Sequence, residues 1–473
     1  MPRPVTRRHF VGAWTLAPTA LSLEAAPPAD TPAILGGAKT HPAPFPSWPV
    51  FDQSEERAIL DTLRGGKWYR GTGKMVDQFQ KAYAELTGAP FCLGVANGTS
   101  ALLTSLSALG VEPGDEVLVP PYTFIATVNV VLQHRALPVF VDTDAQTFQM
   151  DARKIEAAIT PRTRAIIPVH LGGSACDLDA ILPIGARRGI PVVEDACQAH
   201  LAEWRGRKVG TYGKAGCFSF QASKNLNCGE GGAILCNDED LFERCYRLHN
   251  NGTGLQRRIP NFAYDSSGVN LRMPEFQAAL LTAQMARIEA QAATRTGNAT
   301  YLTSMLNQIS GIAAARMYDG CTRNAYHLYM FRYDKSQFAG LPRSAFLKAL
   351  AAEGVPASGG YRPLNQEPFL NEALSARGYK RLFPAKTLSE WQERNRCPVN
   401  AGLCEEAVWF SQTVLLAPRR SMELIADAIR KIQVNAERVP PARCFLLCCP
   451  FISGRQRPTM KRMCFGFQGI ACW

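Results

Sequence analysis

The sequence contains no run of apolar residues long enough to span a bilayer, so no stable membrane insertion is expected. It also lacks paired Cys-x-x-Cys spacings accompanied by histidines. Because zinc sites usually have such spacings, no metal site is expected. Of its 15 cysteines, five lie in the tail after residue 438, and the others are scattered singly along predicted strands and helices. A disulfide framework is not expected in a chain of this length, and the scattered cysteines are typical of small buried hydrophobic side chains.

Acidic residues are missing from the last part of the chain. Beyond Glu437 there is no aspartate or glutamate, and the basic residues there are Arg438, Arg443, Arg455, Arg457, Lys461 and Arg462. This tail and the arginines at positions 3, 7 and 8 account for most of the formal net charge of +12. The remaining body has no basic stripe with interleaved aromatic residues, so a nucleic-acid partner is not expected. Residues 439–473 have no amphipathic period, and we expect them to be disordered.

Short apolar runs alternate with helical patterns in the first half of the chain. We expect strands at residues 91–96, 116–120, 138–142, 165–170 and 191–194, and helices at residues 55–65, 75–88, 99–109, 123–135, 152–159 and 178–188. Such alternation predicts an α/β fold with a mostly parallel central sheet covered by helices.

The second half of the chain has a different pattern. A long helix is predicted from Pro274 toward Ile309, and it should bridge to a smaller C-terminal domain. In that domain we expect a strand at residues 326–333 and helices at residues 343–353 and 422–432, which predicts an α+β unit.

One lysine follows a short aromatic strand. The β-type run at residues 217–220 ends in a turn of small residues that presents Lys224, and the glycines after it, up to Gly232, let the backbone pass close to whatever the lysine touches. An amine held in this way can form a Schiff base with an aldehyde, and the aldehyde that enzymes most often use is pyridoxal phosphate (PLP). The alternative is an ordinary surface lysine in a glycine-rich loop.

An acid at the end of another strand favours the first interpretation. Residues 191–194 have the pattern of a buried parallel strand, and Asp195 follows at its carboxyl end, where α/β proteins bind ligands. PLP chemistry needs a carboxylate at the pyridine nitrogen, because the protonated ring is the electron sink that stabilises a carbanion. A helix-capping aspartate would explain Asp195 alone but not its partner Lys224.

A turn between a strand and a helix predicts an anion site. At Gly98, Thr99 and Ser100, backbone N–H groups at a helix N-terminus are supplemented by two hydroxyls, so we expect the cofactor phosphate there. The alternative is a plain helix N-cap.

Five sequence blocks together resemble one known family. They are Asn97-Gly98-Thr99-Ser100-Ala101-Leu102, Pro121-Tyr122-Thr123-Phe124, Glu194-Asp195 with Gln198, Phe218-Ser219-Phe220 through Lys224 to Gly232, and Gly268-Val269-Asn270-Leu271-Arg272-Met273. Their order and spacing resemble the DegT/DnrJ/StrS sugar aminotransferases over roughly residues 46–437. The resemblance implies a PLP-dependent transferase of the aspartate aminotransferase fold. It also implies a large PLP-binding domain at residues 31–300 and a small domain at residues 301–438.

The resemblance also implies roles for individual residues. Lys224 would hold PLP and move protons, and Asp195 would keep the pyridine ring protonated. Ser219 matches a phosphate ligand, Phe124 matches an aromatic ring that stacks on the pyridine, and Gln198 matches a residue that binds the cofactor's 3′ oxygen. For Phe124, a place in the hydrophobic core is the alternative.

Three further positions are compared with the family. Asn270 matches an asparagine that reaches the phosphate in the neighbouring subunit, which implies a homodimer with shared active sites. His170 matches a family histidine, and a core histidine is an equal alternative. At residues 363–365 the chain has Pro-Leu-Asn where the family usually has Pro-Leu-His, so any substrate role of that histidine does not carry over to Asn365.

The resemblance implies amino transfer from glutamate or glutamine to a nucleotide-linked keto sugar or to a keto-cyclitol. A non-catalytic PLP-binding or sensor protein on the same scaffold is one alternative. A PLP-dependent sugar dehydratase is another, but those relatives have histidine at the position of Lys224.

The N-terminus has the features of an export signal. Arg7 and Arg8 precede a short, weakly apolar stretch and small residues near Ala25 and Ala26, which is typical of a twin-arginine signal followed by a linker up to residue 30. A basic N-terminal extension on a cytoplasmic protein is the alternative, and localisation stays open.

Overall fold

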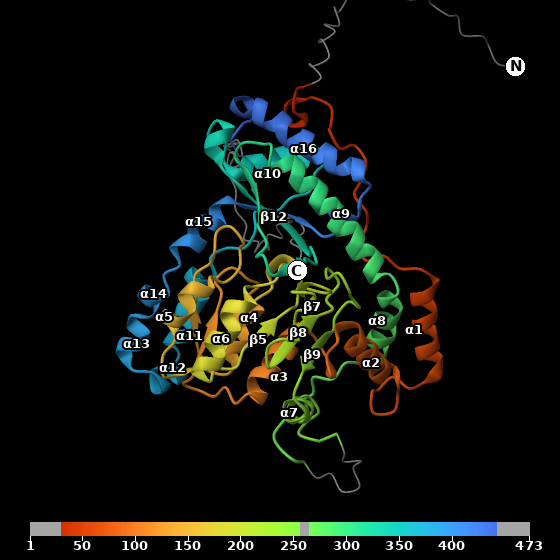
Figure 1. Cartoon of the computed structure of the whole chain (residues 1–473), viewed down its shortest axis with the longest axis vertical. Helices are drawn as coiled ribbons and strands as arrows, with labels where there is room; N and C mark the ends of the chain where they lie inside the picture. Colours follow the sequence, from red (N-terminus) through yellow and green to blue (C-terminus); the bar gives the residue numbers. More distant parts are fainter. Residues whose placement is uncertain (1–29, 256–263, 442–473) are drawn as a thin grey trace, which may run out of the picture.

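The computed structural model describes residues 30–255 and 264–441. The predicted export signal and all but the first three residues of the predicted disordered tail therefore lie outside the described residues. Figure 1 shows two parts: a larger one built around a sheet, and a smaller one that carries the helices α9, α10 and α16.

The larger part contains one twisted sheet with the strand order β3-β2-β4-β5-β8-β9-β1. The strands are β1 (Phe91–Val95), β2 (Glu116–Val119), β3 (Leu137–Phe140), β4 (Thr163–Ile166), β5 (Val193–Asp195), β8 (Ala215–Ser219) and β9 (Gly232–Cys236). Parallel bridges from Ile166 to Val192 and from Val169 to Asp195 join the β3-β2-β4 half to the β5-β8-β9-β1 half. Among the described strands of this sheet, β9 alone runs antiparallel to both neighbours. The predicted mostly parallel sheet is therefore confirmed.

Helices cover both faces of this sheet, and all of them except α7, which was not predicted, match the predicted positions within a few residues. They are α1 (Gln53–Gly65), α2 (Met75–Thr87), α3 (Gly98–Ala108), α4 (Ala126–Gln133), α5 (Ile155–Ala158), α6 (Leu178–Arg188) and α7 (Glu239–His249). Local signals set their ends: in α6, the Asp177 side chain accepts a hydrogen bond from the N–H of Ala180, and Gly189 closes the helix at φ 64°. The buried core lies between sheet and helices, so the carboxyl ends of the parallel strands remain available for a site.

The smaller part is an α+β unit, as predicted. Its antiparallel sheet has the order β10-β12-β13, with β10 (Ile312–Ala314), β12 (Leu328–Tyr333) and β13 (Ala407–Ser411). Helices α9 (Ile288–Leu306), α10 (Arg343–Ala352) and α16 (Arg419–Val434) pack on it. On α16, Met422, Ile425, Ile429 and Ile432 recur at helical spacing and are fully buried. A third small sheet, β11-β6-β7, joins β6 (Glu203–Trp204), β7 (Arg207–Lys208) and β11 (Cys321–Arg323).

The prediction of a single long helix from Pro274 is wrong. Two helices occupy this region, α8 (Glu275–Met285) and α9. At the end of α8, the N–H groups of Ala286 and Arg287 bond to carbonyls three residues back, which tightens the turn and ends the helical bonding pattern. The Arg287 side chain then pairs with Asp52 and Glu55 at the start of α1, a long-range contact that no local pattern encodes.

A run of short helices between β12 and β13 was not anticipated. It contains α11 (Pro368–Ser375), α12 (Arg377–Leu382), α13 (Ala385–Ser389), α14 (Trp391–Arg394) and α15 (Pro398–Glu406). Residues of α11 to α14 pack into the hydrophobic core of the larger part, although they lie within the stretch expected to form the small domain. Trp391 is buried, and its indole N–H donates to the Pro138 carbonyl at 2.9 Å, which fixes this run on β3. Residues from the second half of the sequence therefore pack on the larger part of the molecule.

Several expectations concern absences, and each applies to the described part alone. Within residues 30–255 and 264–441, none of the helices has the length and apolar character to cross a bilayer. The ten cysteines in these ranges are all free; nine are buried and Cys197 is partly exposed. The same ranges contain no group of three potential metal ligands placed to hold an ion.

Candidate active site

Lys224 lies in a loop that connects β8 to β9. Backbone bonds from Ala222 to Gly229 and from Cys228 to Phe220 close this loop, and the N–H of Lys224 donates to the Gln221 carbonyl at 2.8 Å. Burial lowers the pKa of Lys224, and the negative charge of Asp195 only partly offsets that effect. The amine is therefore neutral over more of the pH range than an exposed lysine would be, as a nucleophile must be.

Asp195 ends β5 and is buried. Its Oδ2 accepts a hydrogen bond from the Thr127 hydroxyl at 2.8 Å, and its Oδ1 accepts one from the N–H of Cys197 at 3.2 Å. Thr127 lies in the first turn of α4, and its hydroxyl is 3.1 Å from the hydroxyl of Thr123, which precedes the helix. Each carboxylate oxygen keeps a free lone pair, so Asp195 can bind a further proton donor.

The turn before α3 lies against the end of β8. A side chain at Gly98 would place its Cβ 2.8 Å from the Cβ of Ser219 and 2.8 Å from the Sγ of Cys197, so glycine is required for this approach. A Cβ at Gly232 would similarly lie 2.4 Å from the Asn97 carbonyl. The glycines after Lys224 thus let β9 pass close to this turn, as the sequence suggested.

The three predicted phosphate ligands at this turn differ in their environment. Asn97 caps α3: its Oδ1 accepts from the N–H of Ser100 at 2.8 Å and from the Ser100 hydroxyl at 3.0 Å. The hydroxyl of Ser100 is therefore engaged in the cap, which was the alternative interpretation. Within the described residues, the N–H groups of Gly98 and Thr99 donate no hydrogen bond, and Thr99 is exposed. These two N–H groups at a helix N-terminus form the part of the turn that can bind an anion.

Ser219 and Gln198 are two further residues predicted to contact the cofactor. Ser219 is buried, and its Oγ accepts a weak hydrogen bond from the N–H of Gln221 at 3.3 Å. Gln198 is also buried: its Oε1 accepts from the N–H of Gly172 at 2.8 Å, and its Nε2 donates to the Tyr361 hydroxyl at 3.0 Å. One N–H of this amide remains available to an oxygen acceptor.

Phe124 does not lie in the hydrophobic core. Its side chain is 42% exposed, just ahead of α4, which excludes the core alternative. The ring is therefore free to stack on a planar group, as the resemblance implies.

Two buried histidines lie near Lys224 and are neutral. His200 donates from Nε2 to the Ser219 carbonyl at 2.8 Å and contacts the Tyr83 hydroxyl through Nδ1 at 3.0 Å. Burial lowers the pKa of His200 to about 4. Burial also lowers the pKa of His327, whose Nδ1 contacts the Oδ1 of Asn225 at 3.2 Å. Both rings therefore support the loop around Lys224 without adding charge.

Asn270 is not in this cluster. It is exposed and forms an antiparallel β-bridge with Asn250. The carbonyl of the next residue, Leu271, accepts a hydrogen bond from the N–H of Ala96 at 2.8 Å. Asn365, the residue that departs from the family pattern, is buried and donates to the Asn395 carbonyl at 2.9 Å.

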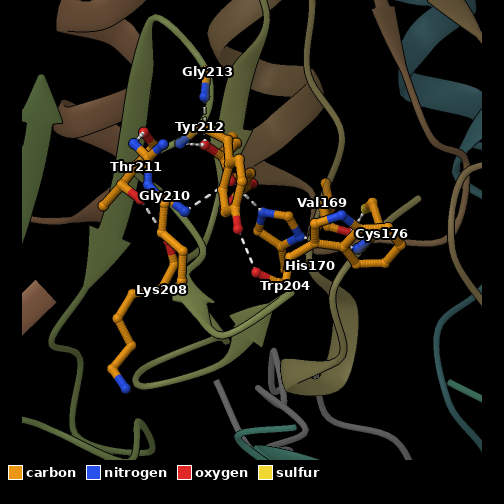
Figure 2. Close-up of polar contacts among 12 residues, drawn as sticks. Val169, His170, Cys176, Trp204, Lys208, Gly210, Thr211, Tyr212 and Gly213 are labelled. Carbon is orange, nitrogen blue, oxygen red and sulfur yellow. Dashed lines mark hydrogen bonds and ion pairs between the residues drawn. The ribbon is translucent and has the colours of Figure 1, made fainter. Parts of the chain in front are cut away.

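His170 is fully buried and pairs with Glu194, the neighbour of Asp195 in β5. Its Nε2 lies 2.9 Å from Oε2 of Glu194, and its Nδ1 accepts from the N–H of Cys176 at 3.1 Å. In Figure 2 the imidazole of His170 faces the turn that carries Gly210, Tyr212 and Gly213. His170 is therefore buried, as the core alternative expects, but its ring also belongs to a polar network.

Sequence reasoning missed two residues of the site. Thr127 has one usable signal, its four-residue spacing from Thr123, which would put both hydroxyls on one face of the helix predicted at residues 123–135. Tyr361 has none, because it reaches Gln198 from more than 160 residues away.

These residues fit the cofactor that the sequence implies. A partly buried amine whose pKa is lowered by burial suits an aldehyde, and a buried carboxylate with free lone pairs suits a pyridine nitrogen. Two unpaired N–H groups beside Ser219 suit a phosphate. All three lie around the carboxyl ends of β5 and β8, so one molecule could contact them together.

The chain matches known proteins over most of its length. Residues 49–408 match the DegT/DnrJ/EryC1/StrS aminotransferase family. The L-glutamine:scyllo-inosose aminotransferase of Streptomyces griseus is 37% identical over 427 residues, which cover 86% of this chain and 98% of the relative. The L-glutamine:2-deoxy-scyllo-inosose aminotransferase of Streptoalloteichus tenebrarius is 34% identical and covers 85% of this chain and 97% of its own length.

A solved structure agrees with the sequence matches. The crystal structure of 3-amino-5-hydroxybenzoic acid synthase superposes with a TM-score of 0.73 at 34% identity, covering 82% of this chain and 98% of that one. The shared architecture is that of the fold type I PLP enzymes. The chain therefore belongs to the DegT/DnrJ/EryC1/StrS aminotransferase family, and it is a PLP-dependent aminotransferase.

Proposed function

We propose that this aminotransferase moves the amino group of L-glutamine to a keto-cyclitol of the scyllo-inosose type. The observation that carries this choice is the 37% identity to an enzyme named for that donor and that acceptor, over 98% of the enzyme's length. A keto sugar, free or nucleotide-linked, is the second candidate acceptor, because the sequence blocks resemble those of the DegT/DnrJ/StrS sugar aminotransferases.

When bound, pyridoxal phosphate supplies an aldehyde that takes up the amino group and a ring that accepts the electron pair freed at the donor carbon. We assign its phosphate to the N–H groups of Gly98 and Thr99, with Ser100 and Ser219 beside them. Phe124 and Gln198 are assigned to the ring face and to the 3′ oxygen.

In this proposal Lys224 is the catalytic acid and base. Its Nζ holds the cofactor between turnovers, and once released it takes the proton from the α-carbon of the donor. The same nitrogen returns a proton when the amine passes to the acceptor ketone. The lowered pKa of Lys224, caused by burial, favours the neutral form that removes the proton.

Asp195 holds a proton on the ring nitrogen. Hydrogen bonds from Thr127 and from the N–H of Cys197 fix the orientation of its carboxylate. A fixed anion at this position stabilises the positive ring nitrogen at every step in which negative charge develops at the donor carbon. The presence of Lys224 speaks against the dehydratase alternative, because those relatives have histidine there. The intact Lys224–Asp195 pair speaks against a non-catalytic sensor.

We also propose a homodimer in which Asn270 completes the partner's phosphate site. Asn270 is exposed and stands next to Val269, which is 53% exposed. Trp68 and Tyr69 are 51% and 52% exposed, and Tyr69 lies under the guanidinium of Arg272 at 5.3 Å. An exposed apolar band of this kind supports a protein interface.

The donor and acceptor can be tested directly. L-Glutamine should convert the cofactor absorbance of the purified protein to that of the amino form. That form should then react with scyllo-inosose or 2-deoxy-scyllo-inosose with a kcat/KM on the order of tenfold or more above that for a nucleotide-linked keto sugar. Preference for the nucleotide-linked sugar would overturn the cyclitol assignment. No conversion by any amino donor would favour the sensor alternative.

Lys224 is expected to be the residue that holds PLP. Borohydride reduction of the holoenzyme, followed by peptide mapping, should place the label on Lys224, and Lys224→Ala should lose both the label and turnover. Lys214→Ala is the matched control, because Lys214 is an exposed lysine beside the same strand β8. A label on another lysine, with an active Lys224→Ala variant, would reject the assignment.

The dimer should be linked to cofactor retention. On dilution, the cofactor-free protein should dissociate into monomers at a higher concentration than the holoenzyme, because Asn270 binds the phosphate across the interface. Sedimentation of both forms measures this. Trp68→Glu should weaken the dimer, whereas Val434→Glu, at a side chain 83% exposed on α16, should not. Equal dissociation of the two forms would mean that each site is built from one chain.

A further inference from the structure

Glu194 is a fully buried carboxylate that the proposed chemistry does not use. Its Oε1 accepts hydrogen bonds from the N–H groups of Tyr212 and Gly213, both at 2.7 Å. Its Oε2 accepts from the N–H of Gly210 at 2.7 Å and from Nε2 of His170 at 2.9 Å. Four donors thus converge on two oxygens, and all the lone pairs of the carboxylate are used. Figure 2 labels the four residues that donate.

The charge and the tautomer of this network follow from its donors. Burial alone would raise the pKa of Glu194, but the hydrogen bonds from His170 and from Gly213 and Gly210 lower it, so the carboxylate is ionised. Nδ1 of His170 accepts from the N–H of Cys176 and carries no proton. The imidazole is therefore neutral, with its one proton on Nε2, pointing at Glu194.

The network surrounds the backbone that presents Asp195. Adjacent residues of a strand point to opposite faces, so Glu194 lies behind β5 while Asp195 faces Lys224. The N–H of His170 donates to the Asp195 carbonyl at 3.0 Å, and the N–H of Asp195 donates to the Pro168 carbonyl at 2.9 Å.

The same network reaches Gln198. Gly172, two residues after His170, donates its N–H to Oε1 of Gln198 at 2.8 Å. On the other side, the turn at residues 210–213 leads directly into β8, the strand that ends at Ser219. The Glu194 carboxylate in β5 is thus bonded both to His170, in the segment after β4, and to the turn that leads into β8.

We propose that the Glu194–His170 pair is a positioning device that sets the orientation of Asp195 and Gln198 toward the cofactor. This inference rests on the proposed roles of Asp195 and Gln198. Neither Glu194 nor His170 touches the reacting atoms; they act through the backbone of β5 and of residues 170–172.

Glu194→Gln is the most direct test, because the amide has the same shape but turns one acceptor into a donor. Whichever way the amide is placed, its NH₂ group meets two N–H donors. His170 cannot relieve the conflict by moving its proton to Nδ1, since that nitrogen would then face the N–H of Cys176. The strand ends must shift, and Asp195 and Gln198 shift with them.

Glu353→Gln is the matched control. Glu353 is also fully buried, and it accepts from the N–H groups of Ala33 and Thr40, the Thr40 hydroxyl and the Lys431 ammonium at 2.7 to 3.0 Å. It lies in the small domain and has no bond to β5. A purely structural role predicts the same pattern of losses for both variants.

We expect both variants to lose thermal stability, measured on the cofactor-free protein. Only Glu194→Gln should also weaken PLP binding, measured by equilibrium dialysis, and lower kcat at saturating PLP, each on the order of tenfold or more. Hydrogen exchange of the cofactor-free protein should rise at residues 168–173 and 195–198 in Glu194→Gln alone. His170→Gln, which keeps a donor toward Glu194, should retain more of kcat than His170→Leu.

The outcomes separate this inference from the proposed function. If Asp195→Asn leaves turnover unchanged, the proposed role of Asp195 fails, whatever Glu194 does. If Asp195→Asn loses turnover but Glu194→Gln matches Glu353→Gln in PLP binding and kcat, the positioning role is rejected. Should Glu194→Gln not fold, the His170 pair decides: equal kcat in His170→Gln and His170→Leu rejects the inference, and a higher kcat in His170→Gln supports it.

Discussion

The structure of the site depends on one short strand, β5, whose last two residues, Glu194 and Asp195, are acids that face opposite sides of the strand. Asp195 faces Lys224, and Glu194 faces away from it into a cage of four donors. A carboxylate in a buried site is costly unless it is hydrogen-bonded, and both acids meet that requirement by recruiting backbone N–H groups and one side-chain donor each. The surrounding strand ends are therefore held at the spacing that these bonds require.

This arrangement explains how a site for a large cofactor is assembled from residues far apart in the sequence. The phosphate turn approaches β8 because Gly98 and Gly232 have no side chain to prevent it. Lys224 reaches the same place from the loop after β8, and Tyr361 comes from the smaller part of the molecule. Membership of the aminotransferase family gives the chemistry of this site.

Local patterns in the sequence predicted the parts of the structure that depend on residues close together in the chain. The α/β alternation predicted the parallel sheet, and a lysine between a strand end and a glycine run predicted the loop of Lys224. The break between α8 and α9 was not predictable in this way, because Arg287 pairs with residues more than 230 positions away. The helices α11 to α14 escaped notice for the same reason: their apolar residues pack on the distant β3 and α4 region. The polar partners of Asp195 and Gln198 likewise come from tertiary contacts.

The proposed mechanism requires that Asp195 keeps the ring nitrogen of the cofactor protonated while Lys224 moves the substrate proton. The most direct measurement is the NMR chemical shift of an isotope-labelled ring nitrogen in PLP bound to the protein, compared between the wild type and Asp195→Asn. We expect a protonated nitrogen in the wild type and an unprotonated one in the variant. An unprotonated nitrogen in the wild type, or no difference between the two proteins, would contradict the account.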